Sequence, residues 1–433
     1  MSLRSALDRG FGVSRRGSTV GREVLAGCTT FLAMSYIIAV NPAILGDAGV
    51  PPAAAAFATC LAAGLGTVVM GLWARMPLAV APGMGLNAYF AYSVVLGLGV
   101  PWQRALGLVF LAGVAFFVLS LLGVRQILLR MMPAPLLPAI GAGIGMFLVL
   151  IGLRNAGLVQ GHETTLVTRG DFSDPGTLLA VGTLLACATL LARGVRAGIL
   201  LAIVGATILS IPLGLAGEAG RPDAGSLGAV MQLDLAGAFA PEMLDVVFAL
   251  LFVDVFDSLG TVIALIRKAG LARPDGRMPG LERVMCVDAG ATVAGSLLGT
   301  STLTTYIESA TGIEAGGRTG LTAVVTGALF LLALPLAPLV AVIPSAAVAA
   351  PLVIVGASTV GLAREIDWDD TDIAVSALFT MAGIPLMFSI ADGLAMGTIC
   401  FVALRLLRGR GSDVPWPVRG LAALFLARFA LLA

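Results

Sequence analysis

Long apolar stretches recur along the chain and are separated by mostly short polar loops. An apolar run of about twenty residues crosses the hydrocarbon core of a bilayer as a helix, so the pattern predicts an all-α polytopic membrane protein with 14 transmembrane segments. The segments lie at 22–41, 53–73, 78–97, 103–123, 135–154, 176–192, 197–214, 243–266, 283–299, 300–315, 319–335, 338–359, 370–388 and 390–408.

Segments 3 and 10 depart from an ordinary helical pattern. Pro77 and Pro82 bracket a β-compatible stretch in segment 3, and a threonine-rich stretch at 300–305 opens segment 10. Extended backbone at membrane depth persists only where protein or a water-filled cavity satisfies its polar groups. We therefore expect short extended stretches at the centre of the helical bundle.

The positive charges favour this count of segments. With the N-terminus inside, the Lys and Arg residues divide as 20 cytoplasmic and 4 outside, leaving aside the two in the C-terminal tail. This bias follows the positive-inside rule. Each half of the chain then holds seven segments, and because seven is odd the second half is inverted relative to the first. Inverted repeats whose broken helices meet near mid-membrane are typical of secondary transporters.

Composition excludes several classes of function. The chain is 58% hydrophobic and 12% charged, and its net charge of +1 gives no reason to expect a nucleic-acid partner. Five cysteines lie singly in apolar segments and the one histidine, His162, lies in a polar loop, so we expect no metal and no cofactor. Without a nucleophile–base pair or a cofactor loop, a membrane-embedded enzyme is disfavoured.

The eighth segment carries the main candidate chemistry. Asp254, Asp257, Ser258 and Thr261 recur three or four residues apart, so they project from one helix face. An ionised Asp at the centre of a membrane helix costs about 2.5 to 3.5 kcal/mol, so it is usually turned toward a cavity and kept for function. Gly260 would let a ligand approach Asp257, whereas Asp254 could also form structural hydrogen bonds to a neighbouring helix.

Glu308 is the candidate carboxylate of segment 10, at the start of a half helix. The helix dipole favours its charge and burial opposes it, which leaves its protonation open to control by a ligand or a proton. Aligning the two broken segments places Asn87 opposite Glu308, which favours a ligand contact, although Asn87 could simply cap its half helix. Ser309 beside Glu308, and Tyr36 in the first segment, are further candidates.

Other polar residues have simpler interpretations. Asn41 and Pro42 are typical of a helix end, and Asp288 and Asp392 are expected to be caps or interface contacts.

The candidate groups together indicate a type of ligand. Carboxylates and amides with no basic residue at mid-membrane suit a neutral ligand rich in N–H donors and would repel an anion. Asp254, Asp257 and Glu308 would together cost about 7 to 10 kcal/mol if all were charged, so at least one is expected to hold a proton. The residues predict a secondary transporter of a polar, planar or cationic solute.

Four motifs in order carry a family resemblance: GCTTFLAMSYIIAVNP (27–42), APGMGLNAYFAY (81–92), FVDVFDSLGT (252–261) and GTSTLTTYIESATGI (299–313). They resemble the purine permeases, the adenine, guanine and hypoxanthine branch of the nucleobase/cation symporters, which are also called xanthine/uracil permeases. The resemblance covers about 11–409. It implies proton-coupled symport of purine nucleobases into the cell by an elevator mechanism. A transporter of another small solute or anion on the same fold is the alternative.

The resemblance also implies roles for the candidate residues. The substrate-binding residues would be Asp257, Glu308, Asn87, Tyr36, Thr261 and Ser309. The proton-coupling residues would be Asp254, Asp257 and Glu308.

Two moving parts, a homodimer and an inner-membrane location with both termini cytoplasmic are implied as well. The moving parts would be a core domain (22–123 and 242–335) and a gate domain (124–214 and 336–408). The remaining segments would be a cytoplasmic N-terminal tail (1–21), an extracellular loop (215–241) and a C-terminal tail (409–433). The last carries Arg419 and Arg428 in a marginally long apolar stretch, so we expect an interfacial helix there.

Overall fold

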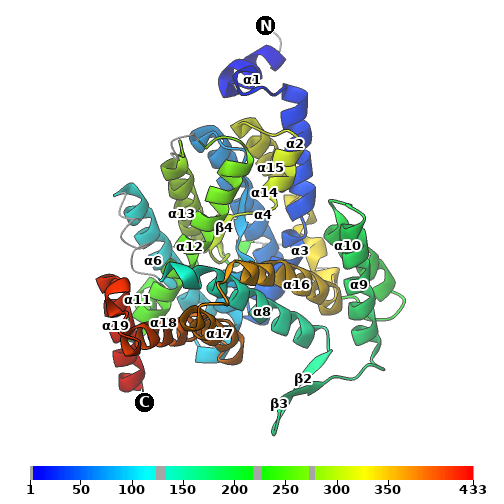
Figure 1. The fold of residues 1–433 in the computed structure, drawn as a ribbon. Helices are drawn as coiled ribbons and strands as arrows, with labels where there is room; N and C mark the ends of the chain where they lie inside the picture. Colours follow the sequence, from blue (N-terminus) through cyan, green and yellow to red (C-terminus); the bar gives the residue numbers. More distant parts are fainter. Residues whose placement is uncertain (1–2, 123–132, 218–226, 273–277, 433) are drawn as a thin grey trace.

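A computed structural model describes residues 3–122, 133–217, 227–272 and 278–432. Five arginines of the expected loops, Arg125, Arg130, Arg221, Arg273 and Arg277, lie outside the described residues, as does the start of the expected gate domain at 124. Helices dominate the described part, and the two chain ends lie far apart, with α1 (Leu3–Phe11) standing away from the bundle (Figure 1).

The first half of the chain begins with a bent helix and continues through a strand flanked by helices. Its elements are α2 (Val20–Met34), α3 (Ile37–Asp47), α4 (Pro52–Val69), a π-helical turn (Met70–Ala74), β1 (Val80–Pro82), α5 (Met84–Ala88), a π-helical segment (Tyr89–Gly97) and α6 (Trp102–Leu121). Then follow α8 (Leu137–Asn155), the projecting hairpin of β2 (Val159–His162) and β3 (Leu166–Arg169), α9 (Pro175–Ala192) and α10 (Gly198–Ser210).

The second half has a similar order of elements. They are α11 (Leu235–Ala238), α12 (Leu244–Lys268), α13 (Leu281–Leu298), β4 (Leu303–Thr305), α14 (Ser309–Glu314), α15 (Gly320–Leu332), a 3₁₀ segment (Leu334–Val342), α16 (Ser345–Val360), α17 (Thr371–Leu386), α18 (Ile390–Leu407) and α19 (Trp416–Leu432).

The described helices are those of an integral membrane protein. Eight are long and apolar enough to cross a membrane, or nine if α15 and the 3₁₀ segment after it, bent by 58°, form one span. The apolar helices α10 and α17 are shorter, and α5 and α14 are half helices that follow the strands. The total of 14 transmembrane segments stays a prediction.

The packing of the first half is repeated in the second. Helix α4 packs against α15 as α13 packs against α6, and α2 packs against α15 as α12 packs against α6. Likewise, α9 packs against α16 and α10 as α17 packs against α8 and α18. The two strands, which lie in the stretches where extended backbone was expected, pair antiparallel with Val80 opposite Thr305. Two structural repeats therefore meet in opposite directions at the strands.

Each strand has its backbone satisfied by a threonine from the helix before it. The Thr67 hydroxyl of α4 accepts a hydrogen bond from the N–H of Val80 and donates to its carbonyl, both at 3.0 Å. The Thr292 hydroxyl of α13 does the same for Leu303, at 3.2 and 2.8 Å. These two threonines let extended backbone lie inside an apolar bundle, where unsatisfied polar groups would be costly.

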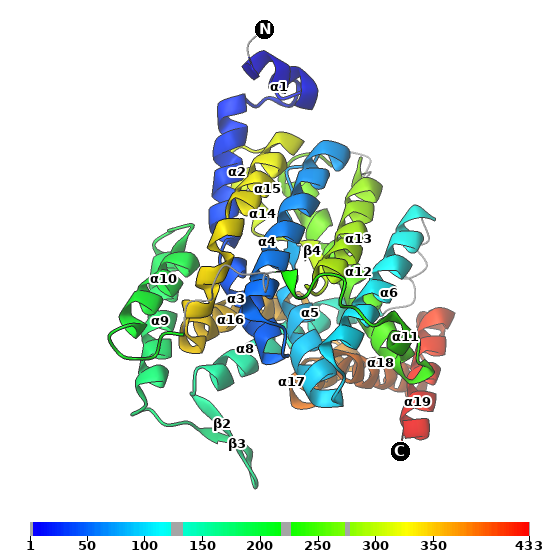
Figure 2. The same cartoon turned by 180° about the vertical axis from the view of Figure 1, so that it is seen from behind.

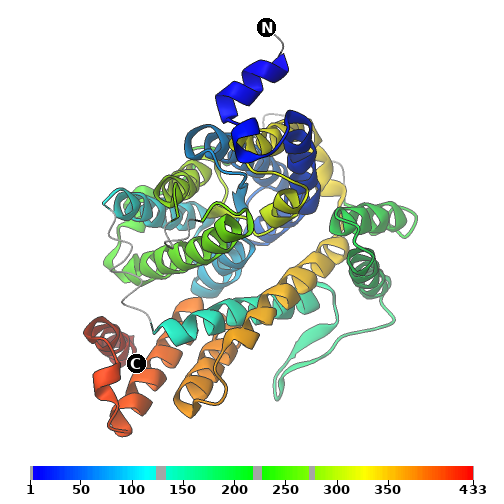
Figure 3. The same cartoon turned by 45° about the horizontal axis from the view of Figure 1, so that its top comes forward.

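The long helices pack into two groups. The strand group contains α2 to α6, α12 to α15, β1 and β4, and the hairpin group contains α8 to α10 and α16 to α18. Figure 2 shows the strand group from behind, with α4, α6 and α13 beside one another. In Figure 3, α8 and α16 of the hairpin group lie side by side beneath the strand group.

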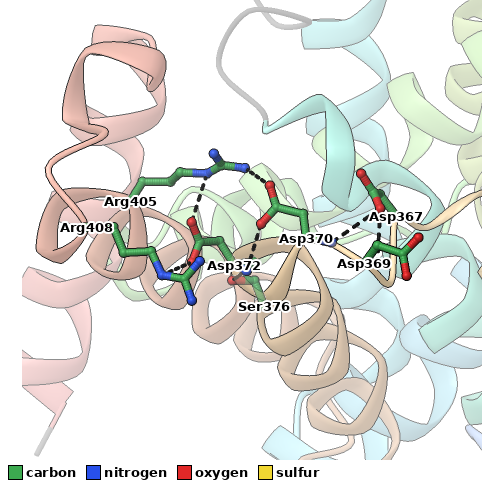
Figure 4. Close-up of polar contacts among 7 residues, drawn as sticks. All are labelled: Asp367, Asp369, Asp370, Asp372, Ser376, Arg405 and Arg408. Carbon is green, nitrogen blue, oxygen red and sulfur yellow. Dashed lines mark hydrogen bonds and ion pairs between the residues drawn. The ribbon is translucent and has the colours of Figure 1, made fainter.

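Ion pairs hold one end of the α17–α18 hairpin (Figure 4). Arg405 contacts Asp370 at 2.6 Å and the buried Asp372 at 3.5 Å, and Arg408 contacts Asp372 at 3.1 Å. Both arginines thus lie within ion-pair distance of Asp372, which offsets the cost of burying its charge.

The C-terminal helix α19 packs along the bundle. Val418 near its start shares an apolar cluster with Phe401 near the end of α18, and Phe425 clusters with Leu394 near the beginning of α18. Trp416, Leu424 and Leu426 of the same helix stay exposed, and its interfacial position stays a prediction.

The expected helix end at Asn41 and Pro42 is wrong. The bend of the first span lies earlier, at Tyr36, and α3 continues to Asp47 with Pro42 inside it. The amide of Asn41 donates to the hydroxyls of Thr59 and Thr300, at 2.7 and 2.9 Å, so side-chain contacts anchor the helix next to the proline.

Candidate functional site

A cavity of about 120 Å³ lies where the two half helices and α12 face the hairpin group. Most of its lining comes from the strand group. The strand-group residues are Tyr36, Gly83, Met84, Gly85, Leu86, Val253, Asp257, Thr261, Thr304, Thr305, Tyr306, Ile307 and Glu308, and the opposite wall consists of Ile144, Leu148, Val355 and Thr359.

Four of the predicted site residues line this cavity. Asp257 projects from α12 and is exposed to the cavity, and Thr261 lies one turn further along the same helix. Glu308, immediately before α14, is half-buried and accepts a hydrogen bond of 2.8 Å from the hydroxyl of Tyr36. The cavity thus presents two carboxylates, a phenol and a threonine hydroxyl.

Asn87 lies behind the cavity wall and not in it. Its side chain is fully buried, donates to the side-chain oxygen Oδ1 of Asn41 at 2.5 Å and accepts from the Ser301 hydroxyl at 2.5 Å. These contacts connect α3, α5 and the residues before β4, so they fix the crossing of the two strands.

Ser309 also has a structural partner. Its hydroxyl oxygen accepts a hydrogen bond of 3.0 Å from the N–H of Ala79, which immediately precedes β1. Asn87 and Ser309, both predicted to bind substrate, therefore connect the two repeats in this structure.

Asp254 points away from the cavity toward α13. One of its oxygens accepts a 3.3 Å hydrogen bond from Thr292, and the other has no hydrogen-bond partner among the described residues. Its carboxylate is fully enclosed, and a buried acceptor oxygen without a hydrogen bond is costly.

Asp288 of α13 is a further buried acid next to the cavity wall, although the sequence predicted only a cap or an interface contact for it. It is fully buried and accepts hydrogen bonds from Ser258 of α12 and, at 2.8 Å, from Thr305 of β4. The sequence does hold a signal, since Asp288, Thr292 and Ser296 recur every four residues and so form a polar stripe on an apolar helix.

The seam between the two helix groups is open on one side of the cavity. Toward the start of α12, Phe252 packs in a cluster with Leu394 of α18 and Phe425 of α19. Toward its end, Asp257, Gly260 and Ala264 are exposed. The cavity therefore opens toward the end of α12 that carries Lys268, and the opposite half of the seam is closed.

A family model described as "Permease family" matches residues 21–399 of the chain. The chain belongs to this family, the xanthine/uracil permeases. It is 39% identical over 429 residues to the adenine permease AdeQ of Escherichia coli, covering 98% of this chain and 96% of AdeQ. It is 38% identical over 430 residues to the guanine/hypoxanthine permease PbuG of Bacillus subtilis, covering 96% of this chain and 98% of PbuG.

Solved structures agree on the fold of this permease. The transmembrane domain of a cyanobacterial bicarbonate transporter, BicA, superposes with a TM-score of 0.66 at 21% identity, covering 87% of this chain and 97% of that domain. At this identity the likeness concerns the fold alone. The permease is accordingly an integral membrane transporter and not an enzyme.

Proposed function

We propose that this permease imports purine nucleobases together with protons. The observation that carries the proposal is the pair of carboxylates, Asp257 and Glu308, that face one cavity from the two repeats. Adenine, guanine and hypoxanthine are the substrates we propose, because relatives that match nearly the full chain are adenine and guanine/hypoxanthine permeases.

The chemistry of the cavity suits a flat ring with N–H donors. Ionised carboxylates accept hydrogen bonds only, and a bond between a ring N–H and a carboxylate is stronger than a neutral one. The apolar side chains of Val253, Ile144 and Val355 offer surfaces for the ring faces. No Lys or Arg is among the described residues that line the cavity. An anion such as bicarbonate would meet two acids there, which argues against the alternative.

The proton would be held by the acidic centre around the cavity. Asp254, Asp257, Asp288 and Glu308 lie in and behind its wall, and charging all of them inside an apolar bundle would be strongly unfavourable. A purine bonded to one carboxylate favours the ionised form of that group, so the shared proton must move to another acid or leave. This competition links substrate binding to proton binding.

Alternating access would follow from movement of the strand group against the hairpin group, which we propose as the core and gate domains that the resemblance implies. The strand group carries both carboxylates and both half helices, whereas the hairpin group offers a mainly apolar wall. If the end of α12 with Lys268 is cytoplasmic, as the positive-inside rule indicates, the cavity is open to the cytoplasm. We extend the proposal to a homodimer in the inner membrane with a cytoplasmic N-terminus.

Competition uptake tests the substrate assignment. Cells that lack their own purine carriers and express this permease would take up radiolabelled adenine, with excess unlabelled adenine, guanine, hypoxanthine, uracil or bicarbonate added in turn. We expect competition by at least one purine and none by bicarbonate. Uptake that bicarbonate suppresses and purines leave unchanged would favour the anion alternative.

A further inference from the structure

Helix α19 contacts both helix groups at the closed half of the seam. Its Arg428 donates from Nη1 to Asp392 at 2.5 Å, and from Nη2 and Nε to Asp245 at 2.9 and 3.2 Å. Asp392 lies in the first turn of α18 in the hairpin group, and Asp245 lies in the first turn of α12 in the strand group. One guanidinium therefore joins the two groups.

The surroundings of Arg428 make this contact stronger than a surface ion pair. The side chains of Arg428, Asp245 and Asp392 are 22%, 33% and 25% exposed, so solvent screens the charges only in part. A planar guanidinium can bond two carboxylates at once in fixed directions, which a lysine cannot do equally well. Without it, the two aspartates would face each other as like charges.

An apolar layer lies next to the ion pairs on the same three helices. Phe252 of α12, Leu394 of α18 and Phe425 of α19 belong to one buried cluster. Figure 1 shows α19 beside α18 at the end of the chain. An ionic contact and an apolar contact thus close the seam at the half opposite the cavity mouth.

We propose that Arg428 is a positioning residue of the transport cycle, a clamp that holds α12 against α18 while the cavity is open on the other side. The inference rests on the proposed function, because it requires the strand group to move against the hairpin group. When the closed half of the seam opens, α12 and α18 separate, and Arg428 can keep at most one of its two carboxylates. Loss of the clamp therefore shifts the population away from the state described here.

Two single-cysteine variants measure how accessible each half of the seam is to a thiol reagent. They are made in purified protein whose five native cysteines are replaced. Ala395→Cys lies in the buried cluster of the closed half. Gly260→Cys lies in the open half, where an added Cβ meets no atom within 4 Å. The labelling rate of each probe with a thiol reagent is measured without purine, once in protein that retains Arg428 and once in protein that carries Arg428→Gln.

The clamp predicts opposite changes at the two probes. Arg428→Gln should raise the labelling rate of Ala395→Cys about three- to tenfold, as expected for losing charge-assisted bonds at a partly exposed site, and should lower that of Gly260→Cys. Asp245→Asn and Asp392→Asn should each shift both probes in the same directions. Arg419→Gln is the matched control, because Arg419 on the same helix bonds carbonyls of its own segment at Gly411 and Val414.

Three results would overturn the clamp. Unchanged rates at both probes would show that Arg428 does not hold the seam. Faster labelling at both probes would show general loss of packing, and an equal effect of Arg419→Gln would show that α19 is merely destabilised. Because these rates are read without purine, a permease that fails to transport purines yet shows the opposite shifts would refute the proposed substrate and leave the clamp standing.

Discussion

Replacing Asp257 by asparagine removes one acceptor charge from the cavity and keeps the shape of the side chain. Asp257 is exposed to the cavity and asparagine keeps a side-chain oxygen that can accept hydrogen bonds, so the substitution should not impair folding. A hydrogen bond to a charged group contributes about 1.5 to 3 kcal/mol, so we expect purine affinity to fall about 10- to 150-fold.

Asp254→Asn is the informative comparison, since it makes the same change one turn away on the same helix. Asp254 does not line the cavity, so its substitution should leave purine affinity nearly unchanged but alter the number of protons exchanged on binding. Calorimetry of the purified variants with adenine and hypoxanthine, in buffers of different ionisation enthalpy, measures both quantities. Thermal unfolding of each variant checks its folding.

Two results would refute this reasoning. Equal losses of affinity in both variants would mean that purine affinity depends on the total charge of the acids around the cavity and not on a direct contact with Asp257. Unchanged affinity in Asp257→Asn would remove that residue from the binding site.

Three further predictions concern the site, the packing and the orientation. Tyr36→Phe removes the donor to Glu308, so apparent purine affinity should change by up to about tenfold while the protein stays folded, as uptake kinetics would measure. Gly320→Ala places a Cβ 1.9 Å from the carbonyl oxygen of Gly71, so the midpoint of thermal unfolding should fall by several degrees; no change would refute this tight contact. Thr164→Cys in the exposed β2–β3 loop should react with an impermeant reagent only from outside, and labelling from the cytoplasm would reverse the predicted orientation.

Sequence periodicity could predict the elements that carry strong local signals. The extended stretches in segments 3 and 10 were predictable, because prolines and threonines interrupt apolar runs that are otherwise helical. The carboxylates of the cavity were predictable too, because Asp257 and Glu308 are conspicuous in apolar surroundings and burying them there is costly.

The roles of the remaining polar residues depend on long-range contacts that no local pattern contains. Asn87 lies opposite Glu308 by repeat alignment, yet its amide is used by Asn41 and Ser301, which are 46 and 214 residues away. Asp288 lies on α13, and only the crossing of β4 over that helix brings Thr305 to it. In both cases tertiary packing decides whether a buried polar group faces ligand or protein.

The lengths of the helices also explain why hydropathy alone does not determine the number of transmembrane segments. Half helices such as α5 and α14 are too short to cross a bilayer, so hydropathy counts them only when it includes the adjoining strand. Helix α19 has a marginal length and two arginines, and the sequence alone does not show that Arg428 contacts Asp392 of the preceding helix and Asp245 of the distant α12.

The central claim is that this permease accumulates purines at the expense of a proton gradient. The most direct measurement is uptake of radiolabelled adenine, guanine and hypoxanthine into proteoliposomes that contain only the purified protein, with an imposed pH gradient, acidic outside. We predict accumulation of at least one purine above its external concentration, collapse of that accumulation by an uncoupler, and its loss in Asp257→Asn. Equilibration without accumulation, indifferent to the uncoupler, would contradict proton coupling, and no purine entry at all would contradict the proposed function.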